Sequence, residues 1–226
     1  MKMLFLGTGA ADWSPDRDIA GQEYRGNCSA LVDGSILIDP GPTVPRALEK
    51  FDIAPRDIRY VINTHTHRDH FNADTLAFLQ SYGAEHVRLT DGDSLYLGDV
   101  KVSAVRGNHR SDTYTLHYMF ESDGHRIFYA LDGAWLMYDE VELIKQAPVD
   151  ICVLDGTVGF GQGDYRVFEH NNMAMVIQMK DTLTMYARDF YISHMSCGLH
   201  TDHDTLARAM AEHGINVAYD GLEIVL

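Results

Sequence analysis

The sequence of 226 residues contains few cysteines, and they form no recognisable pattern. Cys28, Cys152 and Cys197 are far apart and odd in number, and no Cys-x-x-Cys pair occurs. Disulfide frameworks use an even set of cysteines, and thiolate zinc sites use closely spaced pairs. We therefore expect neither, and the cysteine content is typical of a reducing compartment.

Basic residues are also scarce. The chain has 18 Lys plus Arg against 33 Asp plus Glu, which gives a formal net charge of −15 and a pI near 5.0. General binding to nucleic acid or to an anionic membrane surface requires basic patches. We therefore expect neither nucleic acid nor a membrane as a partner.

Long hydrophobic runs are absent as well. The apolar run 3–6 near the start is far shorter than the roughly 7–15 residues of a signal-peptide core. It is better interpreted as a first strand, and no segment approaches the length of a membrane span. These observations predict a cytoplasmic protein.

The sequence shows no internal repeat, low-complexity tract or long linker, so we expect one domain over residues 1–226. Residues 33–34, Asp-Gly, have the composition of a hairpin turn. Strands come in two groups, each followed by helices, which predicts the α/β class (α+β type) as a four-layer αββα sandwich. The expected strands span 2–8, 28–33, 35–41, 59–65, 86–92, 99–107, 113–121, 125–133, 149–156, 189–194 and the ending 216–226. The expected helices span 42–51, 73–82, 135–146, 172–180 and 202–213.

The stretch 63–70, NTHTHRDH, concentrates side chains that can ligate metal. In extended backbone His65 and His67 point to the same side, so both imidazoles can reach one ion. Asp69 and His70 follow in the turn and can face a second ion. A single histidine would more often be structural, but packing does not account for this cluster, and we interpret it as half of a metal site.

Three further candidates stand where predicted strands end, namely His109, Asp132 and His194. Taken singly, Asp132 is also consistent with a helix cap near Trp135, and His194 with a buried structural histidine. Taken together, they complete a site for two divalent cations. We assign His65, His67 and His109 to one ion, then Asp69, His70 and His194 to the other. Asp132 would bridge them, and nitrogen and carboxylate donors suit zinc or manganese.

These residues resemble the His-x-His-x-Asp-His motif and distant ligands of the metallo-β-lactamase superfamily, whose fold is an αββα sandwich. Further stretches resemble its phosphodiesterase branch, above all the phosphoribosyl cyclic phosphodiesterases of phosphonate degradation, with the tRNA 3′-processing endonucleases as close relatives. The resemblance spans nearly the whole chain. The stretches that carry it are 6–10 (LGTGA), 25–29 (RGNCS), 36–41 (ILIDPG), 192–194 (ISH) and 219–224 (YDGLEI).

The resemblance also implies a residue beside the scissile phosphate. That branch keeps a histidine at the start of a helix, and His170 in the stretch 169–172, EHNN, matches it. The alternative is that His170 is only a neighbour of a helix cap formed by Asn171 or Asn172. We expect His170, together with the ligand Asp69, to be catalytic.

The sequence departs from this branch near its N-terminus. The cyclic phosphodiesterases carry a cysteine-rich insertion that holds a separate structural zinc, whereas residues 11–28 have no cysteine cluster. Cys197 stands where a histidine ligand would be expected, so we do not expect the additional zinc.

The remaining histidines are expected to be structural. His86, His117 and His125 are expected at the surface or partly buried. His200 and His203 flank a stretch that resembles a helix capping box, Thr201-x-x-Asp204. Whether His200 or His203 also lines the pocket is left open.

The expected activity is a metal-dependent hydrolase that acts on a small phosphodiester, cyclic or linear. Two cations can hold one hydroxide between them for attack on phosphorus. An RNA endonuclease of the tRNA 3′-processing type is the first alternative, although no Gly/Lys/Arg-rich arm is present. A lactone or ester hydrolase is the second, and His170 argues against it. A third alternative is a metal-binding module that has lost catalysis, but such a module would not need every ligand. The oligomeric state stays open, and a homodimer is one possibility.

Overall fold

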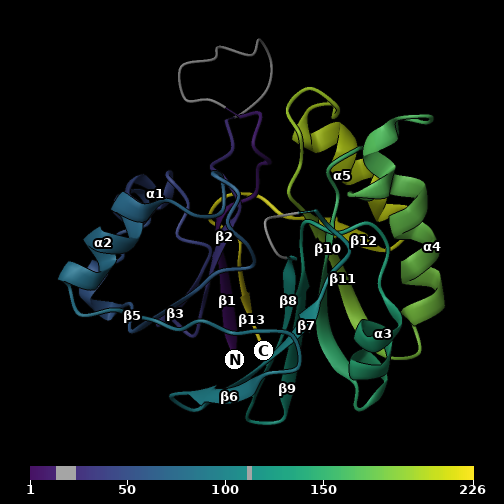
Figure 1. Ribbon diagram of the computed structural model, residues 1–226. Helices are drawn as coiled ribbons and strands as arrows, with labels where there is room; N and C mark the ends of the chain where they lie inside the picture. The colour runs from purple at the N-terminus through teal and green to yellow at the C-terminus, as the bar shows by residue number, and fades with distance from the viewer. Residues whose placement is uncertain (14–23, 111–113) are drawn as a thin grey trace.

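Two mixed β-sheets face each other in the computed structural model, which describes residues 1–13, 24–110 and 114–226 (Figure 1). The first sheet has the strand order β13-β1-β2-β3-β4-β5. Strands β1, β2 and β13 pair antiparallel, whereas β3, β4 and β5 run parallel. Its strands are β1 (Lys2–Gly7), β2 (Ser29–Val32), β3 (Ile36–Ile38), β4 (Tyr60–Ile62), β5 (Glu85–His86) and β13 (Glu223–Val225).

The second sheet has the order β12-β11-β10-β9-β8-β7-β6. Its half from β6 to β9 is antiparallel, and its half from β9 to β12 is parallel. Strands β7, β9, β10 and β11 consequently all run in one direction, and their carboxyl ends meet at one edge. The strands are β6 (Ser94–Leu97), β7 (Val100–Arg106), β8 (Leu116–Ser122), β9 (His125–Ala130), β10 (Val149–Asp155), β11 (Ala187–Ser193) and β12 (Ile215–Val217).

The helices cover the outer faces of both sheets (Figure 1). Helices α1 (Val44–Lys50) and α2 (Ala73–Ser81) pack on the first sheet. Helices α3 (Tyr138–Lys145), α4 (Met173–Leu183) and α5 (His203–Ala211) pack on the second. Short 3₁₀ turns, η1 (Pro55–Asp57) and η2 (Tyr165–Phe168), lie in the connections. This layering confirms the αββα sandwich.

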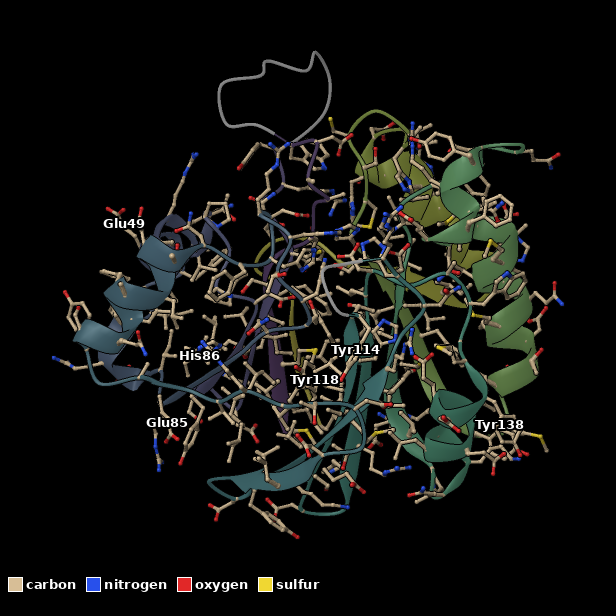
Figure 2. All side chains as sticks on the ribbon, viewed as in Figure 1. Glu49, Glu85, His86, Tyr114, Tyr118 and Tyr138 are labelled. Atoms are coloured by element: carbon tan, nitrogen blue, oxygen red, sulfur yellow. The ribbon has the colours of Figure 1, made fainter. Side chains whose placement is uncertain are left out.

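Three buried apolar clusters hold the four layers together, one between the sheets and one under each set of helices. Figure 2 shows Tyr118 in the interior, and this residue is fully buried between the sheets. Its hydroxyl donates a hydrogen bond to the Asn63 carbonyl at 2.7 Å, which links the second sheet to the loop that follows β4. Burial of apolar surface at roughly 25 cal/mol per Å² is the dominant stabilising term for such layers.

The two sheets also meet through backbone at the edge where the strands end. Gly9 forms β-bridges to both Asn27 and Met195. The Met195 amide donates to the Thr8 carbonyl at 3.0 Å, and the Ala10 amide donates to the Met195 carbonyl at 3.0 Å. The end of β1 is therefore fixed against the segment that follows β11.

Some predicted boundaries differ from the structure. The predicted strand 86–92 is wrong beyond His86, because only Glu85 and His86 pair with β4. The helix expected from Trp135 begins at Tyr138, since Trp135 has a left-handed φ of 59° that a helix cannot contain. Strand β6 was not anticipated. The Asp33-Gly34 hairpin turn is confirmed by positive φ at both residues.

No helix in the described ranges has both the length and the apolar character needed to cross a membrane. The organisation of residues 1–226 as one domain stays a prediction.

Candidate metal centre

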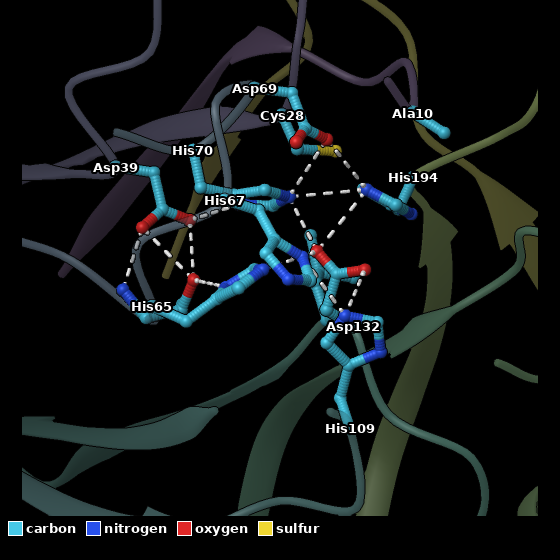
Figure 3. A network of polar contacts seen from close by, with 12 residues as sticks. Ala10, Cys28, Asp39, His65, His67, Asp69, His70, His109, Asp132 and His194 are labelled. Carbon is cyan, nitrogen blue, oxygen red and sulfur yellow. Dashed lines mark hydrogen bonds and ion pairs between the residues drawn. The ribbon is translucent and has the colours of Figure 1, made fainter. Parts of the chain in front are cut away.

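The loop after β4 delivers four of the predicted ligands. His65, Asp69 and His70 are buried, whereas His67 is exposed. Asp39, which follows β3, positions this loop (Figure 3). Its carboxylate accepts the Thr64 amide at 2.6 Å, and it lies 2.8 Å from the Nδ1 atom of His70. The first sheet thus supplies a preformed cluster from one short segment.

The second sheet supplies its candidates one at a time. His109 follows β7, Asp132 follows β9 and His194 follows β11, all at the edge where these parallel strands end. Asp132 and His194 have left-handed φ angles of 54° and 65°. Such angles are uncommon outside glycine, and they cluster at functional sites where the surrounding structure maintains them.

The ligand atoms of these residues form overlapping groups in which all atoms lie within 4.8 Å of one another. The structure brings together all seven residues predicted as ligands, in the combinations predicted from sequence, with Asp132 belonging to more than one group (Figure 3). The groups of the described residues are His65, His67 and His109; His65, His70 and Asp132; Asp69, His70 and His194; and Asp132, Asp155, His170 and His194.

For His65, His109 and His194, a hydrogen bond to an outer partner leaves the other ring nitrogen facing the cluster. His109 Nδ1 lies 3.2 Å from the Glu169 carbonyl, which can only accept, so Nε2 of a neutral ring carries the lone pair. His65 Nδ1 bonds to Thr64 at 2.9 Å, and His194 Nδ1 bonds to Thr157 at 2.7 Å. Such outer partners orient metal ligands and set their tautomers.

The ring nitrogens and carboxylate oxygens that converge in the cluster have too few hydrogen-bond donors among them. His70 Nε2 and His194 Nε2 lie 3.2 Å apart, and His70 Nε2 also contacts Asp132. His65 Nε2 is buried without a hydrogen-bond partner. Buried polar atoms are almost always partnered, and lone pairs that face one another repel. A divalent cation would satisfy these atoms, so the residues present fit a metal centre.

The electrostatics of the cluster support this interpretation. Burial and the neighbouring His70 lower the pKa of His65 to about 2, so its ring is neutral and able to bind metal. Burial alone would raise the pKa of Asp132, but His194 and His70 outweigh it and hold that pKa well below its usual value. Burial lowers the pKa of His70, but Asp132, Asp39 and Asp69 outweigh it and hold that pKa well above its usual value. A cation bound here would take the place of that proton, because neutral imidazoles and ionised carboxylates are the forms in which these side chains bind metal.

His170 lies beside the cluster and contacts a carboxylate outside the seven candidate ligands. Its Nδ1 is 3.0 Å from Asp155 Oδ2 and 3.5 Å from Asp132 Oδ1. Burial lowers the pKa of His170, but the Asp155 carboxylate more than compensates and the pKa rises to about 9. Thr157 donates to the same Asp155 oxygen at 2.9 Å. Asp155 therefore engages His170 Nδ1 and favours the protonated form of the ring.

A cleft of about 410 Å³ opens over these residues. Its lining includes His67, Asp69 and His170, together with Arg166. Among the described residues that line the cleft, Arg166 is the only one with a permanent positive charge, and its guanidinium lies 3.6 Å from Asp164. The volume suits a small molecule.

The sequence left open whether Asp132 caps a helix and whether Asn171 or Asn172 caps the helix after His170. Asp132 is not the cap of α3, because the N-cap position of that helix is Met137. Asn172 caps α4 by accepting the Met175 amide at 3.0 Å, so His170 lies next to a helix cap as well as beside the cluster.

Two interpretations made from the sequence require correction, and one open question is answered. The capping box proposed for Thr201 and Asp204 is wrong, because Asp202 caps α5 by accepting the Thr205 amide at 3.0 Å. His117 is fully buried, not at the surface. His200 and His203 line a separate cavity of about 260 Å³ and are not part of the cleft lining.

Cys197 contributes to a loop, not to a cluster of ligands. Its thiol donates to the Asp12 carbonyl at 3.2 Å, and its amide donates to the Asp12 carboxylate at 3.0 Å. All three cysteines are free. Part of the cysteine-poor stretch 11–28, namely residues 14–23, lies outside the described residues.

Sequence reasoning missed Asp39, Asp155 and Thr157. Asp155 is the last residue of β10, and Asp132 stands at the corresponding place after the neighbouring parallel strand β9. This position at the end of a parallel strand was the signal that could have identified Asp155. Asp39 lay inside the stretch 36–41 quoted for the resemblance, but its contact with His70 depends on the pairing of β3 with β4.

Comparison with known proteins agrees with this geometry. A family model described as the metallo-beta-lactamase superfamily matches residues 22–178, and the chain belongs to that superfamily. None of the curated proteins searched matches the chain.

Similar solved structures include three that match this chain over its whole length. A diphosphatase from the PhnP family is 21% identical, with a TM-score of 0.76 over 100% of this chain and 97% of that chain. Zn²⁺-bound PqqB from Methylobacterium extorquens is 16% identical, with a TM-score of 0.78 over 100% of both chains. The short form of human tRNase Z is 18% identical, with a TM-score of 0.70 over 100% of this chain and 99% of that chain. At these identities the likeness shows the fold alone.

Proposed function

We propose that this protein is a dinuclear metal-dependent phosphodiesterase that hydrolyses a small phosphodiester, cyclic or linear. The observation that carries the proposal is that seven candidate ligands converge at a cleft whose wall also holds His170, with its Nδ1 bonded to Asp155. The ligands are His65, His67, Asp69, His70, His109, Asp132 and His194.

Zinc or manganese suits these nitrogen and carboxylate donors. Two such cations would supply the positive charge that an anionic phosphate needs in this acidic protein, and would lower the pKa of water in the cleft. Two similar structures are consistent with this choice, because one is described as a diphosphatase of the PhnP family and the other as zinc-bound PqqB.

The chain's own residues have separate tasks in this proposal. Asp155 and Thr157 hold the His170 ring, and Nδ1 donates to Asp155. Nε2 is therefore the atom from which a proton can pass to the departing ester oxygen. Arg166 at the cleft wall would bind a phosphate oxygen through its fixed positive charge.

The test combines metal analysis with a substrate screen. Plasma mass spectrometry of the purified protein should find about two equivalents of zinc or manganese. Bis-p-nitrophenyl phosphate and a panel of cyclic and linear phosphodiesters should be hydrolysed, with activity lost on chelation and restored by metal. Well under one equivalent, with no activity gained on adding either metal, would refute the proposal.

The same screen addresses the alternatives. A pre-tRNA substrate tests the RNA endonuclease, and a lactone panel tests the ester hydrolase. Cleavage of either at rates well above those for every small phosphodiester would replace the proposed substrate class while leaving the metal centre in place.

A further inference from the structure

A buried ion pair lies beneath the candidate metal centre and is not part of its ligand set. His117 on β8 and Glu140 on α3 are both fully buried. His117 Nδ1 lies 2.5 Å from Glu140 Oε1. The other Glu140 oxygen accepts the Met137 amide at 2.6 Å, so the carboxylate is held in place by its own helix start.

The second nitrogen of His117 points to the chain that carries the bridging candidate. Nε2 lies 2.9 Å from the carbonyl oxygen of Leu131, the residue before Asp132. A carbonyl can only accept, so Nε2 carries a proton. Nδ1 faces a carboxylate and donates as well. Burial lowers the pKa of His117, but Glu140 more than compensates and raises it, in agreement with a ring that is protonated on both nitrogens.

The ring is also wedged between two glycines in the ligand-bearing loops. A Cβ added at Gly107 would lie 2.4 Å from His117 Cε1, and one added at Gly133 would lie 2.6 Å from the same atom. Gly107 comes two residues before His109, and Gly133 directly follows Asp132. No side chain larger than hydrogen fits at either position while the imidazole is there.

Two hydrogen bonds join the loop that carries Gly107 to the loop that carries Gly133. The Ala134 amide donates to the Asn108 carbonyl at 3.0 Å, and the Asn108 side-chain amide donates to the Ala134 carbonyl at 3.0 Å. The ring of His117 lies under this joined unit and is bonded to it through Leu131. Asp132, with its left-handed φ of 54°, therefore has a fixed peptide group on its N-terminal side.

We propose that the His117–Glu140 pair is a positioning device that sets the geometry of the metal centre by holding Asp132 and His109. The inference rests on the proposed function, because Asp132 and His109 are candidate metal ligands. Outer contacts of this kind typically change metal affinity or activity on the order of 10–100-fold when they are removed. A buried ion pair is a weak source of stability by itself, which favours a role in geometry.

Two substitutions separate positioning from simple packing. In His117→Asn the amide nitrogen takes the place of Nδ1, so the Glu140 contact can persist while the Leu131 contact is lost. In His117→Gln the amide nitrogen takes the place of Nε2, so the Leu131 contact can persist. The measurement is zinc affinity by competition with a chelating dye, at a temperature well below unfolding. We expect His117→Asn to lose on the order of 10–100-fold in affinity, and His117→Gln to recover most of it.

Ile144→Ala is the matched control, because Ile144 is fully buried in the same helix α3 but contacts neither loop through a hydrogen bond given by the structure. It should lower the melting temperature and leave zinc affinity unchanged. Equal affinities for His117→Asn and His117→Gln, or a matching loss in Ile144→Ala, would overturn the inference. A wild-type protein that binds no zinc would overturn the metal centre itself, and the positioning role with it.

Glu140→Gln keeps the inference testable if neither His117 variant folds. The substitution preserves the shape of the side chain but replaces one acceptor oxygen with a donor, so Met137 or His117 loses its partner. Zinc affinity should fall at least several-fold relative to Ile144→Ala. Affinity equal to that of the control would overturn the positioning role.

Discussion

The two sheets contribute to the candidate site in different ways. The first sheet delivers His65, His67, Asp69 and His70 from one loop after β4. The second sheet delivers single residues from the ends of separate strands, each brought to the same edge by the parallel arrangement of β7, β9, β10 and β11. One half of the site is thus local in sequence, and the other half exists only after the sheet has formed.

This difference has a physical consequence for how the halves respond to change. A local cluster depends on a few backbone dihedrals and on one outer carboxylate, Asp39. The dispersed half depends on strand register, on left-handed backbone at Asp132 and His194, and on the contacts beneath them. Asp132 belongs to groups that contain histidines from both sheets, so it is the residue on which the halves meet.

The largest effect is expected from Asp132→Ala, which removes that meeting point. A carboxylate shared by both groups cannot be replaced by a neighbour, so the variant should lose metal and activity together. The loss should exceed the roughly 100-fold that marks the upper range for outer contacts. Plasma mass spectrometry and turnover of bis-p-nitrophenyl phosphate are the measurements.

Asp181→Ala provides the control, because the Asp181 side chain is 65% exposed and lies in α4 away from the cleft. It should keep both metal and activity. Two bound ions and near-normal turnover in Asp132→Ala would mean that the halves are held independently and that Asp132 is not a bridge.

His170→Ala tests the dispersed half without removing a ligand. The variant should keep both ions, because His170 is not among the seven ligands, yet kcat should fall on the order of 10²–10⁴-fold. The loss should shrink for substrates with good leaving groups such as p-nitrophenolate, which depart with little protonation. The measurement is kcat across aryl phosphodiesters of graded leaving-group pKa, for wild type and variant.

Parallel lines of equal slope for the two proteins would remove the proton-donor role and leave the metal site standing. A change confined to KM would instead indicate that His170 positions the substrate. Phe168→Ala, a change of an exposed neighbour in η2, should alter neither slope nor metal content.

Asp39→Asn tests the local half. Asp39 accepts the Thr64 amide and bonds to His70 Nδ1, and an asparagine can serve only one of these donors well. Zinc affinity should therefore fall on the order of 10–100-fold, measured by dye competition.

Asp33→Asn is the matched change at the far side of the same sheet. Asp33 accepts the Lys2 amide at 2.6 Å in an exposed turn, so its substitution should leave zinc affinity unaltered. Equal affinity for wild type and Asp39→Asn would show that the loop holds His70 without its outer carboxylate.

The same contrast explains how much could be predicted from the sequence. The cluster in the stretch 63–70 was evident because four candidate ligands lie within six residues. The layered fold followed from the grouping of strands and helices. The position of Asp155 at the end of a predicted strand could have marked it as a site residue. Its contact with His170 and that of Asp39 with His70 could not be predicted, because they join residues 15 and 31 positions apart. Burial of His117 was missed because its partner Glu140 lies on a helix that packs against the strand only in three dimensions.

The smallest effect is expected from Cys197→Ser, in the loop that follows His194. The thiol donates to the Asp12 carbonyl, and a serine hydroxyl can donate to the same atom, so the loop should keep its backbone contacts. Metal content should stay at about two equivalents, and the melting temperature should change by about 2–4 °C for each kcal/mol lost. Cys152→Ser should destabilise the fold more, because that thiol is fully buried among apolar side chains in the core under α3 and α4. It should also leave metal content unchanged. A measured loss of a third metal equivalent in Cys197→Ser alone would show that a separate structural ion is held beside the dispersed half of the site.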